Sequence, residues 1–109
     1  MTIEEVSTAL TAGIHSIYGD FLDRVILYGS TARGTAKEDS DVDIAILLHP
    51  GASRKMYDDL LDLLVNLELE YGKVLSVIRI DTEKFAAWEN VIPFYKNIKN
   101  EGIILWKAA

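Results

Sequence analysis

The chain has 109 residues, carries a formal net charge of −6 and contains no cysteine. This length predicts one domain, residues 1–109, with a hydrophobic core of its own. The missing cysteines exclude disulfides and thiolate metal sites. The acidic balance argues against an extended nucleic-acid surface, which needs a basic face. Because the sequence shows no basic leader and no apolar run of membrane-spanning length, it predicts a cytoplasmic protein without a membrane partner.

The first expected element is an amphipathic helix over residues 3–18, because its apolar residues recur at spacings of three and four. Thr2 is a candidate N-cap, and two glutamates in the first turn suit the positive end of the helix dipole. A short β-branched and aromatic run, residues 25–28, then predicts a buried strand. Gly29 and Ser30 follow it, and glycine there allows a tight turn and a close approach to a ligand.

Residues 30–34 can form a single helical turn after this strand. Its free amides and the positive end of its dipole, together with the Ser30 hydroxyl, favour a phosphate group. Two alternatives stay open for Arg33. It either adds a charge-assisted contact to phosphate or pairs with an acid of the following loop, namely Glu38, Asp39 or Asp41.

The second expected strand, residues 41–47, carries Asp41 and Asp43 one residue apart. Side chains alternate along a strand, so these two carboxylates point to one face about 7 Å apart. They repel each other unless a cation lies between them, and hard oxygen ligands suit Mg²⁺ or Mn²⁺. By itself, an Asp-x-Asp pattern on a strand is more often a solvated face than a metal site.

The second half of the chain predicts packing elements. Residues 54–71 form a broad apolar helical stripe, with Ser53 as N-cap and Gly72 as C-cap. The remaining expected elements are a strand over 73–80, a helix starting at Asp81-Thr82, a helix from Pro93 to the region of Gly102, and an apolar terminal strand over 103–106.

The combined string, GSTARGTAKEDSDVDIAIL, resembles the signature of the DNA polymerase beta-like nucleotidyltransferase superfamily. More closely, it is similar to the minimal nucleotidyltransferases of prokaryotes. Their pattern is Gly-Ser-x-Ala-Arg-Gly, a short loop, then Ser-Asp-x-Asp-aliphatic, and every element of it is present. The resemblance implies an α/β (α+β) polymerase beta-like nucleotidyltransferase fold, with a small mixed sheet and helices packed on one side.

The resemblance also implies an activity, which is metal-dependent transfer of a nucleoside monophosphate, AMP from ATP, to a hydroxyl acceptor. Asp41 and Asp43 would be the catalytic residues and hold Mg²⁺ or Mn²⁺, while Gly29, Ser30 and Arg33 would bind the nucleotide phosphates. In this family the acceptor is usually a tyrosine of a helical HEPN-type protein encoded nearby. The nucleotidyltransferase then acts as the antitoxin of a toxin–antitoxin pair.

One element departs from the family, because its enzymes generally use a third carboxylate on the next strand. The position expected for it is filled by Ser76, and the nearest other acids are Glu70 and Asp81. A serine cannot take the proton of an acceptor hydroxyl as a carboxylate does. This leaves an alternative, a catalytically weak or inactive protein that neutralises its partner by binding. A subunit of a homo-oligomer with a purely structural use of the fold is the third possibility.

Overall fold

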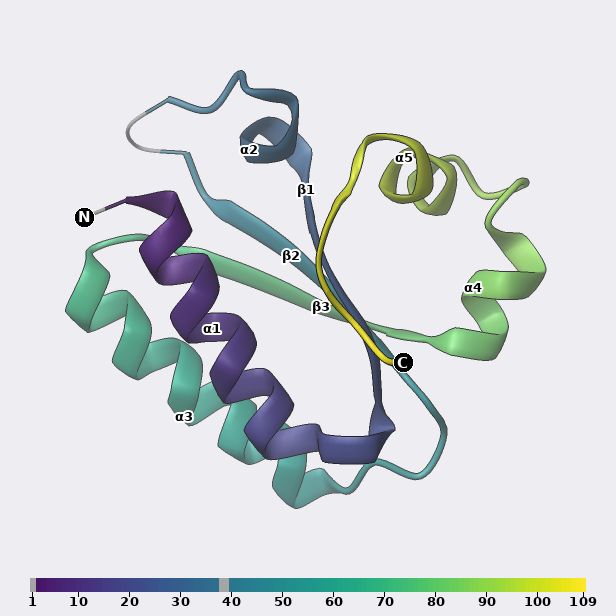
Figure 1. The fold of residues 1–109 in the computed structure, drawn as a ribbon, viewed down its shortest axis with the longest axis horizontal. Coiled ribbons are helices and arrows are strands. Elements are labelled where there is room, and N and C mark those ends of the chain that lie inside the picture. The colour runs from purple at the N-terminus through teal and green to yellow at the C-terminus, as the bar shows by residue number, and fades with distance from the viewer. Residues whose placement is uncertain (1, 38–39) are drawn as a thin grey trace.

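Helices and strands alternate along the chain as far as the helix that ends at Trp88, which is followed by a second helix, in the computed structural model, which describes residues 2–37 and 40–109. In chain order the elements are α1 (Ile3–Tyr18), the 3-10 turn η1 (Gly19–Phe21), β1 (Leu22–Tyr28), α2 (Gly29–Arg33), β2 (Val42–Leu48), α3 (Arg54–Tyr71), β3 (Leu75–Asp81), α4 (Thr82–Trp88), α5 (Pro93–Glu101) and β4 (Ile103–Lys107) (Figure 1). No helix in these two ranges is both long enough and apolar enough to cross a membrane.

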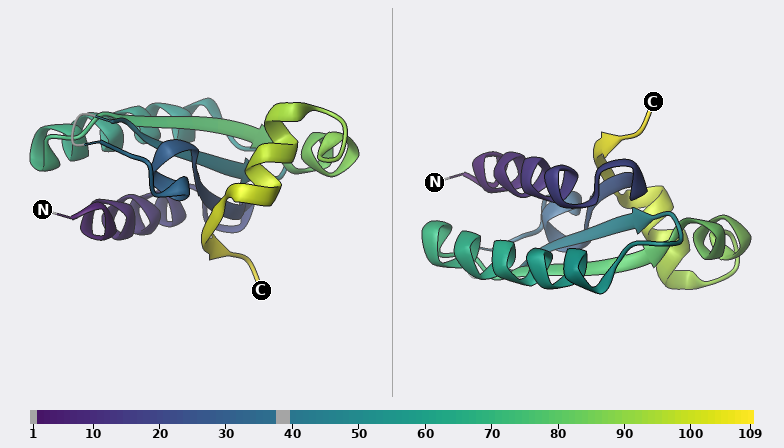
Figure 2. Two further views of the ribbon diagram at one scale, coloured as in Figure 1. Left: turned by 90° about the horizontal axis from the view of Figure 1, so that it is seen from above. Right: turned by 90° about the horizontal axis from the view of Figure 1, so that it is seen from below.

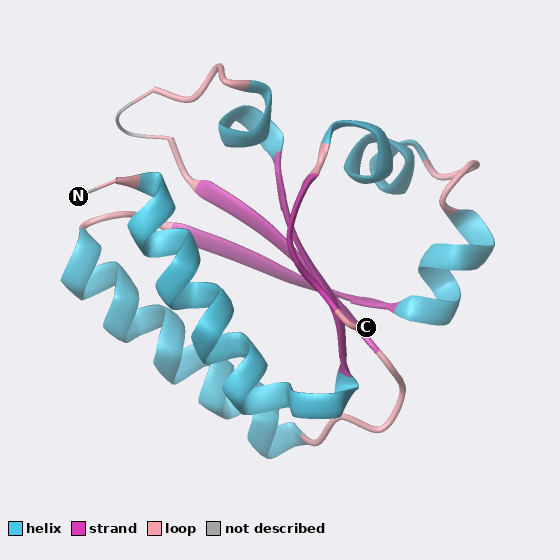
Figure 3. Cartoon of the chain, viewed as in Figure 1, coloured by secondary structure: helices cyan, strands magenta, loops and turns pink. Residues whose placement is uncertain are grey.

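The strands form one mixed sheet in the order β3-β2-β1-β4. β1 runs antiparallel to both β2 and β4, whereas β2 and β3 are parallel. Parallel neighbours need a crossover connection, and α3 supplies it. The predicted mixed sheet is therefore confirmed, and Figure 3 shows its strands crossing the middle of the molecule between two groups of helices.

The two long helices cover one face of the sheet, which we call the closed face. Alternate residues of β2 point to it, and Val42, Ile44 and Ile46 are fully buried there. α1 and α3 pack beside each other above these residues, and each contributes an apolar stripe to the same core. Figures 1 and 2 show both helices on the same side of the molecule, away from α4 and α5.

The opposite face, which we call the open face, is covered at one end only. Ala45 and Leu47 of β2 are fully buried in a second apolar cluster with Phe85 of α4 and Ile98 of α5. The expectation that helices pack on one side thus needs correction, because it holds for α1 and α3 but not for α4 and α5. The physical reason is that the second half of β2 is apolar on both faces, so both must be shielded from water.

Local capping signals placed the helix ends correctly. The Thr2 hydroxyl accepts a hydrogen bond from the Glu5 amide at 3.1 Å and so caps α1. The Ser53 hydroxyl caps α3 in the same way, and Gly72 ends that helix with a left-handed backbone. The strands are less well predicted, because β1 begins three residues earlier, at Leu22, than the apolar run indicated.

Candidate active site

A row of polar side chains crosses the uncovered end of the open face. In the strand register Tyr28 lies opposite Asp43, and Asp43 lies beside Ser76 of β3. Residues paired in register on neighbouring strands point to the same face of a sheet. The row therefore occupies the face on which Ala45 and Leu47 are buried. Tyr28 packs against their apolar cluster, while Asp43 and Ser76 are part-buried.

Gly29 brings the start of α2 directly against Asp43. Its φ of +73° lies in the left-handed region, which strains residues with a side chain. A Cβ at this position would lie 2.6 Å from Oδ2 of Asp43, closer than real contacts allow. Glycine is thus required here twice, for its backbone angle and for the close approach of the carboxylate.

The two aspartates interact electrostatically. Asp43 is part-buried, and its pKa is raised first by this burial and then by the negative charge of Asp41, while Arg33 acts in the opposite direction. Asp41 immediately precedes β2, whose first residue is Val42, instead of lying within the strand as predicted. The neighbouring phenol of Tyr28 also has a raised pKa, because it is part-buried and lies near Asp43.

This donor set fits a small divalent cation. A hard cation bound between two adjacent carboxylates reduces the repulsion between their charges. The need is greater here because one of the two, Asp43, is part-buried. No group of three or more histidine, aspartate or glutamate side chains with metal-binding spacing occurs within residues 2–37 and 40–109. Mg²⁺ accepts such a site, because it commonly takes one or two protein carboxylates and completes its shell with phosphate oxygens and water.

Arg33 pairs with a residue that the sequence did not suggest. Its Nη1 lies 3.4 Å from Oε2 of Glu101, and both side chains are about half exposed. Of the predicted partners, Glu38 and Asp39 lie outside the described residues. An exposed pair of this length contributes about 0–1 kcal/mol, so Arg33 can exchange Glu101 for a phosphate at little cost.

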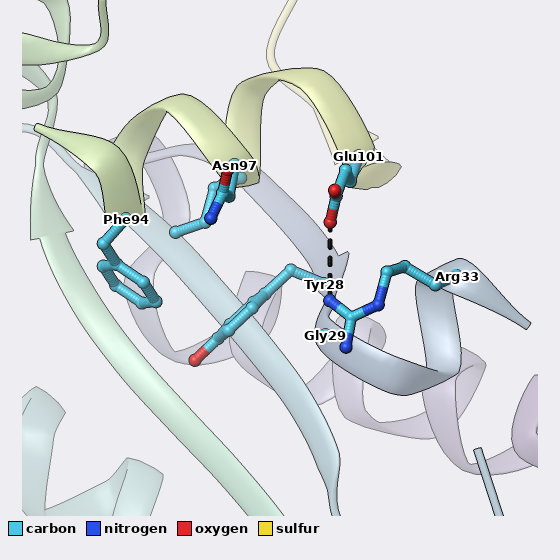
Figure 4. A pocket seen from close by; sticks show the side chains of 7 residues that line it. Tyr28, Gly29, Arg33, Phe94, Asn97 and Glu101 are labelled. Carbon is cyan, nitrogen blue, oxygen red and sulfur yellow. Dashed lines mark hydrogen bonds and ion pairs between the residues drawn. The ribbon is translucent and has the colours of Figure 1, made fainter. Parts of the chain in front are cut away.

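A hollow of about 160 Å³ opens between the end of β1, α2 and α5. Tyr28, Gly29 and Arg33 line one side of it, and Phe94, Asn97 and Glu101 project into it from α5 (Figure 4). The sequence motif does not include these three residues of α5. Their spacing of three and four, which places them on one helical face, was the available signal.

Ser76 occupies the place beside Asp43, and the alternative acids lie elsewhere. Asp81 pairs with Leu48 at the opposite end of β3. Its carboxylate accepts hydrogen bonds from the Glu83 and Lys84 amides at 2.9 and 3.0 Å, which makes it the cap of α4. Glu70 lies on α3, which covers the closed face. Neither acid can therefore reach Asp43 from its position in this fold.

Comparison with known proteins agrees with this geometry. Residues 14–105 match the family model of the nucleotidyltransferase domain. This match, together with the fold and the aspartate pair, defines the chain as a nucleotidyltransferase. A Methanocaldococcus jannaschii protein, provisionally named a protein adenylyltransferase, is 30% identical over 106 residues that cover 97% of this chain and 100% of that protein.

Solved structures share the fold at lower sequence identity. One, provisionally described as a minimal nucleotidyltransferase, is 23% identical with a TM-score of 0.62, covering 94% of this chain and 95% of that chain. Another comes from a complex of a tri-AMPylated HEPN toxin of Shewanella oneidensis with its MNT antitoxin. It is 15% identical with a TM-score of 0.54, covering 96% of this chain and 72% of that chain. The chain belongs to the nucleotidyltransferase domain family, as the sequence motif predicted.

Proposed function

We propose that this protein transfers AMP from ATP to a hydroxyl group of a partner protein and releases pyrophosphate. The observation that carries the proposal is the close approach of Gly29 to Asp43, which is itself beside Asp41. A protein that only binds a partner has no physical need for two adjacent carboxylates at a glycine turn. The name of the Methanocaldococcus jannaschii relative supports adenylylation of a protein.

The partner we propose is a HEPN-type toxin encoded nearby, with this chain as its antitoxin. The AMPylated toxin in the Shewanella oneidensis complex supports this choice, because the antitoxin there has the same fold. We propose that the partner brings its own hydroxyl, for which a tyrosine is our candidate, to the uncovered end of the sheet.

Each residue of the site has a proposed role. Asp41 and Asp43 would hold Mg²⁺ or Mn²⁺, which when bound offsets the charge of the α-phosphate and the leaving pyrophosphate. Ser30 and the Gly29 turn bind the outer phosphates of the nucleotide. Arg33 releases Glu101 and adds a charge-assisted hydrogen bond to the same phosphates. Together they orient the triphosphate against the aspartates.

The transfer step forms a bond from the acceptor oxygen to the α-phosphorus and breaks the bond from that phosphorus to the bridging oxygen. Pyrophosphate leaves with the electron pair of the broken bond, and the hydroxyl proton must pass to a base. Ser76 cannot accept it, because a neutral hydroxyl is far too weak a base. We propose that water or a side chain of the partner accepts the proton, with correspondingly slow transfer.

Ser76 also favours a second candidate function, in which the protein neutralises its partner by binding alone. An acid is absent where the family places one, next to Asp43. This candidate predicts a stable complex whose formation does not depend on ATP. The two functions therefore differ in one measurable product, the AMP attached to the partner.

The deciding experiment is intact-protein mass spectrometry of the HEPN-type partner after incubation with this chain, ATP and Mg²⁺. We expect a mass gain of one or more AMP units. The control is the Asp41→Ala, Asp43→Ala double variant, for which the gain should vanish while the complex persists on gel filtration. A stable wild-type complex without any mass gain would instead establish neutralisation by binding.

A further inference from the structure

Two aromatic side chains, Tyr28 and Phe94, line the hollow between β1 and α5. The rings of Tyr28 and Phe94 meet edge to face with centroids 5.6 Å apart. Phe94 is 44% exposed although it lies beside the apolar cluster of the open face. An exposed aromatic ring at the rim of a hollow offers a flat surface on which another ring can stack.

The size and position of the hollow restrict its occupant. Its volume of about 160 Å³ is below the range of about 300–1,000 Å³ that holds a drug-sized ligand, so it suits a single flat ring system. Gly29 and Arg33 line the hollow and are also the proposed phosphate ligands. A molecule that carries phosphates at one end and an aromatic ring at the other can therefore reach both places.

Arg33, Asn97 and Glu101 line the hollow, and Arg33 and Glu101 pair with each other. Asn97 is therefore the side chain of this set that can distinguish between purine bases. Asn97 projects into the hollow from α5, between Phe94 and Glu101 (Figure 4). A carboxamide offers one acceptor and two donors, which match the amino group and ring nitrogen of adenine. Guanine presents two acceptors on the corresponding edge and is better read by arginine.

We infer that Tyr28, Phe94 and Asn97 form the adenine subsite of the nucleotide-binding site. Phe94 stacks on the base, Tyr28 supports the Phe94 ring from its edge, and Asn97 reads the amino group and a ring nitrogen. The inference rests on the proposed function, because it places the phosphates of the same nucleotide at Ser30 and Arg33. It assigns to α5 the choice of ATP over other nucleotides.

Calorimetric titration with two probes in the presence of Mg²⁺ tests the inference. ATP engages both the base and the phosphates, whereas inorganic tripolyphosphate engages only the phosphate ligands. We expect Phe94→Ala and Phe94→Leu to weaken ATP binding roughly 5- to 100-fold, the effect of removing one base–aromatic stack. Tripolyphosphate binding should stay within about twofold of wild type, because the phosphate ligands are untouched.

Asn97→Ala provides the specificity arm of the test, with Asn100→Ala as its matched control. Both residues are exposed asparagines of α5, but Asn100 does not line the hollow. We expect Asn97→Ala to reduce the preference for ATP over GTP about 5- to 100-fold, and Asn100→Ala to leave it unchanged. Thermal unfolding of each variant verifies that α5 remains folded.

The outcomes separate this inference from the proposed function. If wild type binds ATP no more tightly than tripolyphosphate, or if the variants at Phe94 and Asn97 bind ATP like wild type, the adenine subsite is wrong while the phosphate site stands. If wild type binds neither probe, both proposals fail together. If variants lose both probes equally, the residues act only on the structure of the site and the inference is overturned.

Discussion

The two faces of β2 show how one strand serves both stability and chemistry. On the closed face Val42, Ile44 and Ile46 are fully buried under two long helices. On the open face the strand changes from the buried Ala45 to the part-buried Asp43 within two residues. The site lies where the apolar cover ends, so we expect substitutions on the two faces to have separable effects.

The largest effects should come from neighbouring residues on opposite faces. Ile44→Ala removes a fully buried side chain and should lower the free energy of unfolding by about 2–5 kcal/mol. Asp43→Asn should leave that free energy nearly unchanged but slow AMP transfer about 1,000-fold or more. A bound metal lowers the activation free energy by several kcal/mol, and about 1.36 kcal/mol corresponds to a tenfold change in rate. Urea unfolding and a transfer assay measure the two effects. If Asp43→Asn unfolds the protein as Ile44→Ala does, the separation of the faces is wrong.

Ser76→Asp tests the chemical role of the open face by adding a third carboxylate to its row of polar side chains. Because the register sets Ser76 beside Asp43, an aspartate there should supply the missing base and raise the transfer rate about 100-fold or more. The control is Ser76→Asn, because asparagine is similar in size to aspartate but cannot take the proton. Single-turnover kinetics with saturating ATP measure the rate. An unchanged rate with normal ATP binding would mean that the partner already supplies the base.

A comparison of alanine variants at two glycines with nearly the same φ tests the contact between the start of α2 and Asp43. Gly29 and Gly34 have φ values of +73° and +75°, but a Cβ would meet Asp43 only at Gly29. Both substitutions to alanine should destabilise the fold by about 1–2 kcal/mol through backbone strain. Only Gly29→Ala should also slow transfer, by up to about 100-fold, because it displaces the carboxylate of Asp43, a proposed metal ligand. Equal transfer rates for the two variants would show that the close approach has no functional role.

The smallest effect concerns the pair that holds Arg33. Glu101→Gln removes an exposed ion pair and frees Arg33 for phosphate, so tripolyphosphate should bind up to about fivefold more tightly. Glu83→Gln removes the same charge from α4, away from the hollow, and controls for the change in net charge. Titration calorimetry at low salt measures both variants. Identical gains for the two variants would attribute the effect to net charge alone.

Local rules explain which parts of this molecule the sequence predicts. Helices α1 and α3 have the expected bounds because caps such as Thr2 and Ser53 act within three residues. The start of β1 was missed because Asp23 and Arg24 interrupt its apolar run, and they pair with each other at 2.8 Å at the edge of the core. A pattern of hydrophobicity does not show that such a pair can lie within a strand.

The candidate site was predicted in part, for a related reason. Its aspartates, Gly29 and Ser30 are close in sequence and carry a motif. The contribution of α5 depends on the pairing of β4 with β1, which brings Glu101 to Arg33 across 68 positions of sequence. The spacing within α5 shows that Phe94, Asn97 and Glu101 share a helical face, but it does not show which element this face meets, because that depends on the order of strands in the sheet.

The same strand order has a consequence for the local stability of the hollow. β4 is an edge strand, and Ile103 and Ile104 are about half exposed. Only Gly102 separates it from α5, and this glycine lies directly against Ile26 of β1, with no room for a side chain. Edge strands with exposed residues open at low free energy. Fraying of β4 would carry α5 away from β1 and would also loosen the closed face, because Leu105 and Trp106 of β4 pack against the core of that face. The stability of the hollow and that of the closed face are therefore coupled through this edge strand.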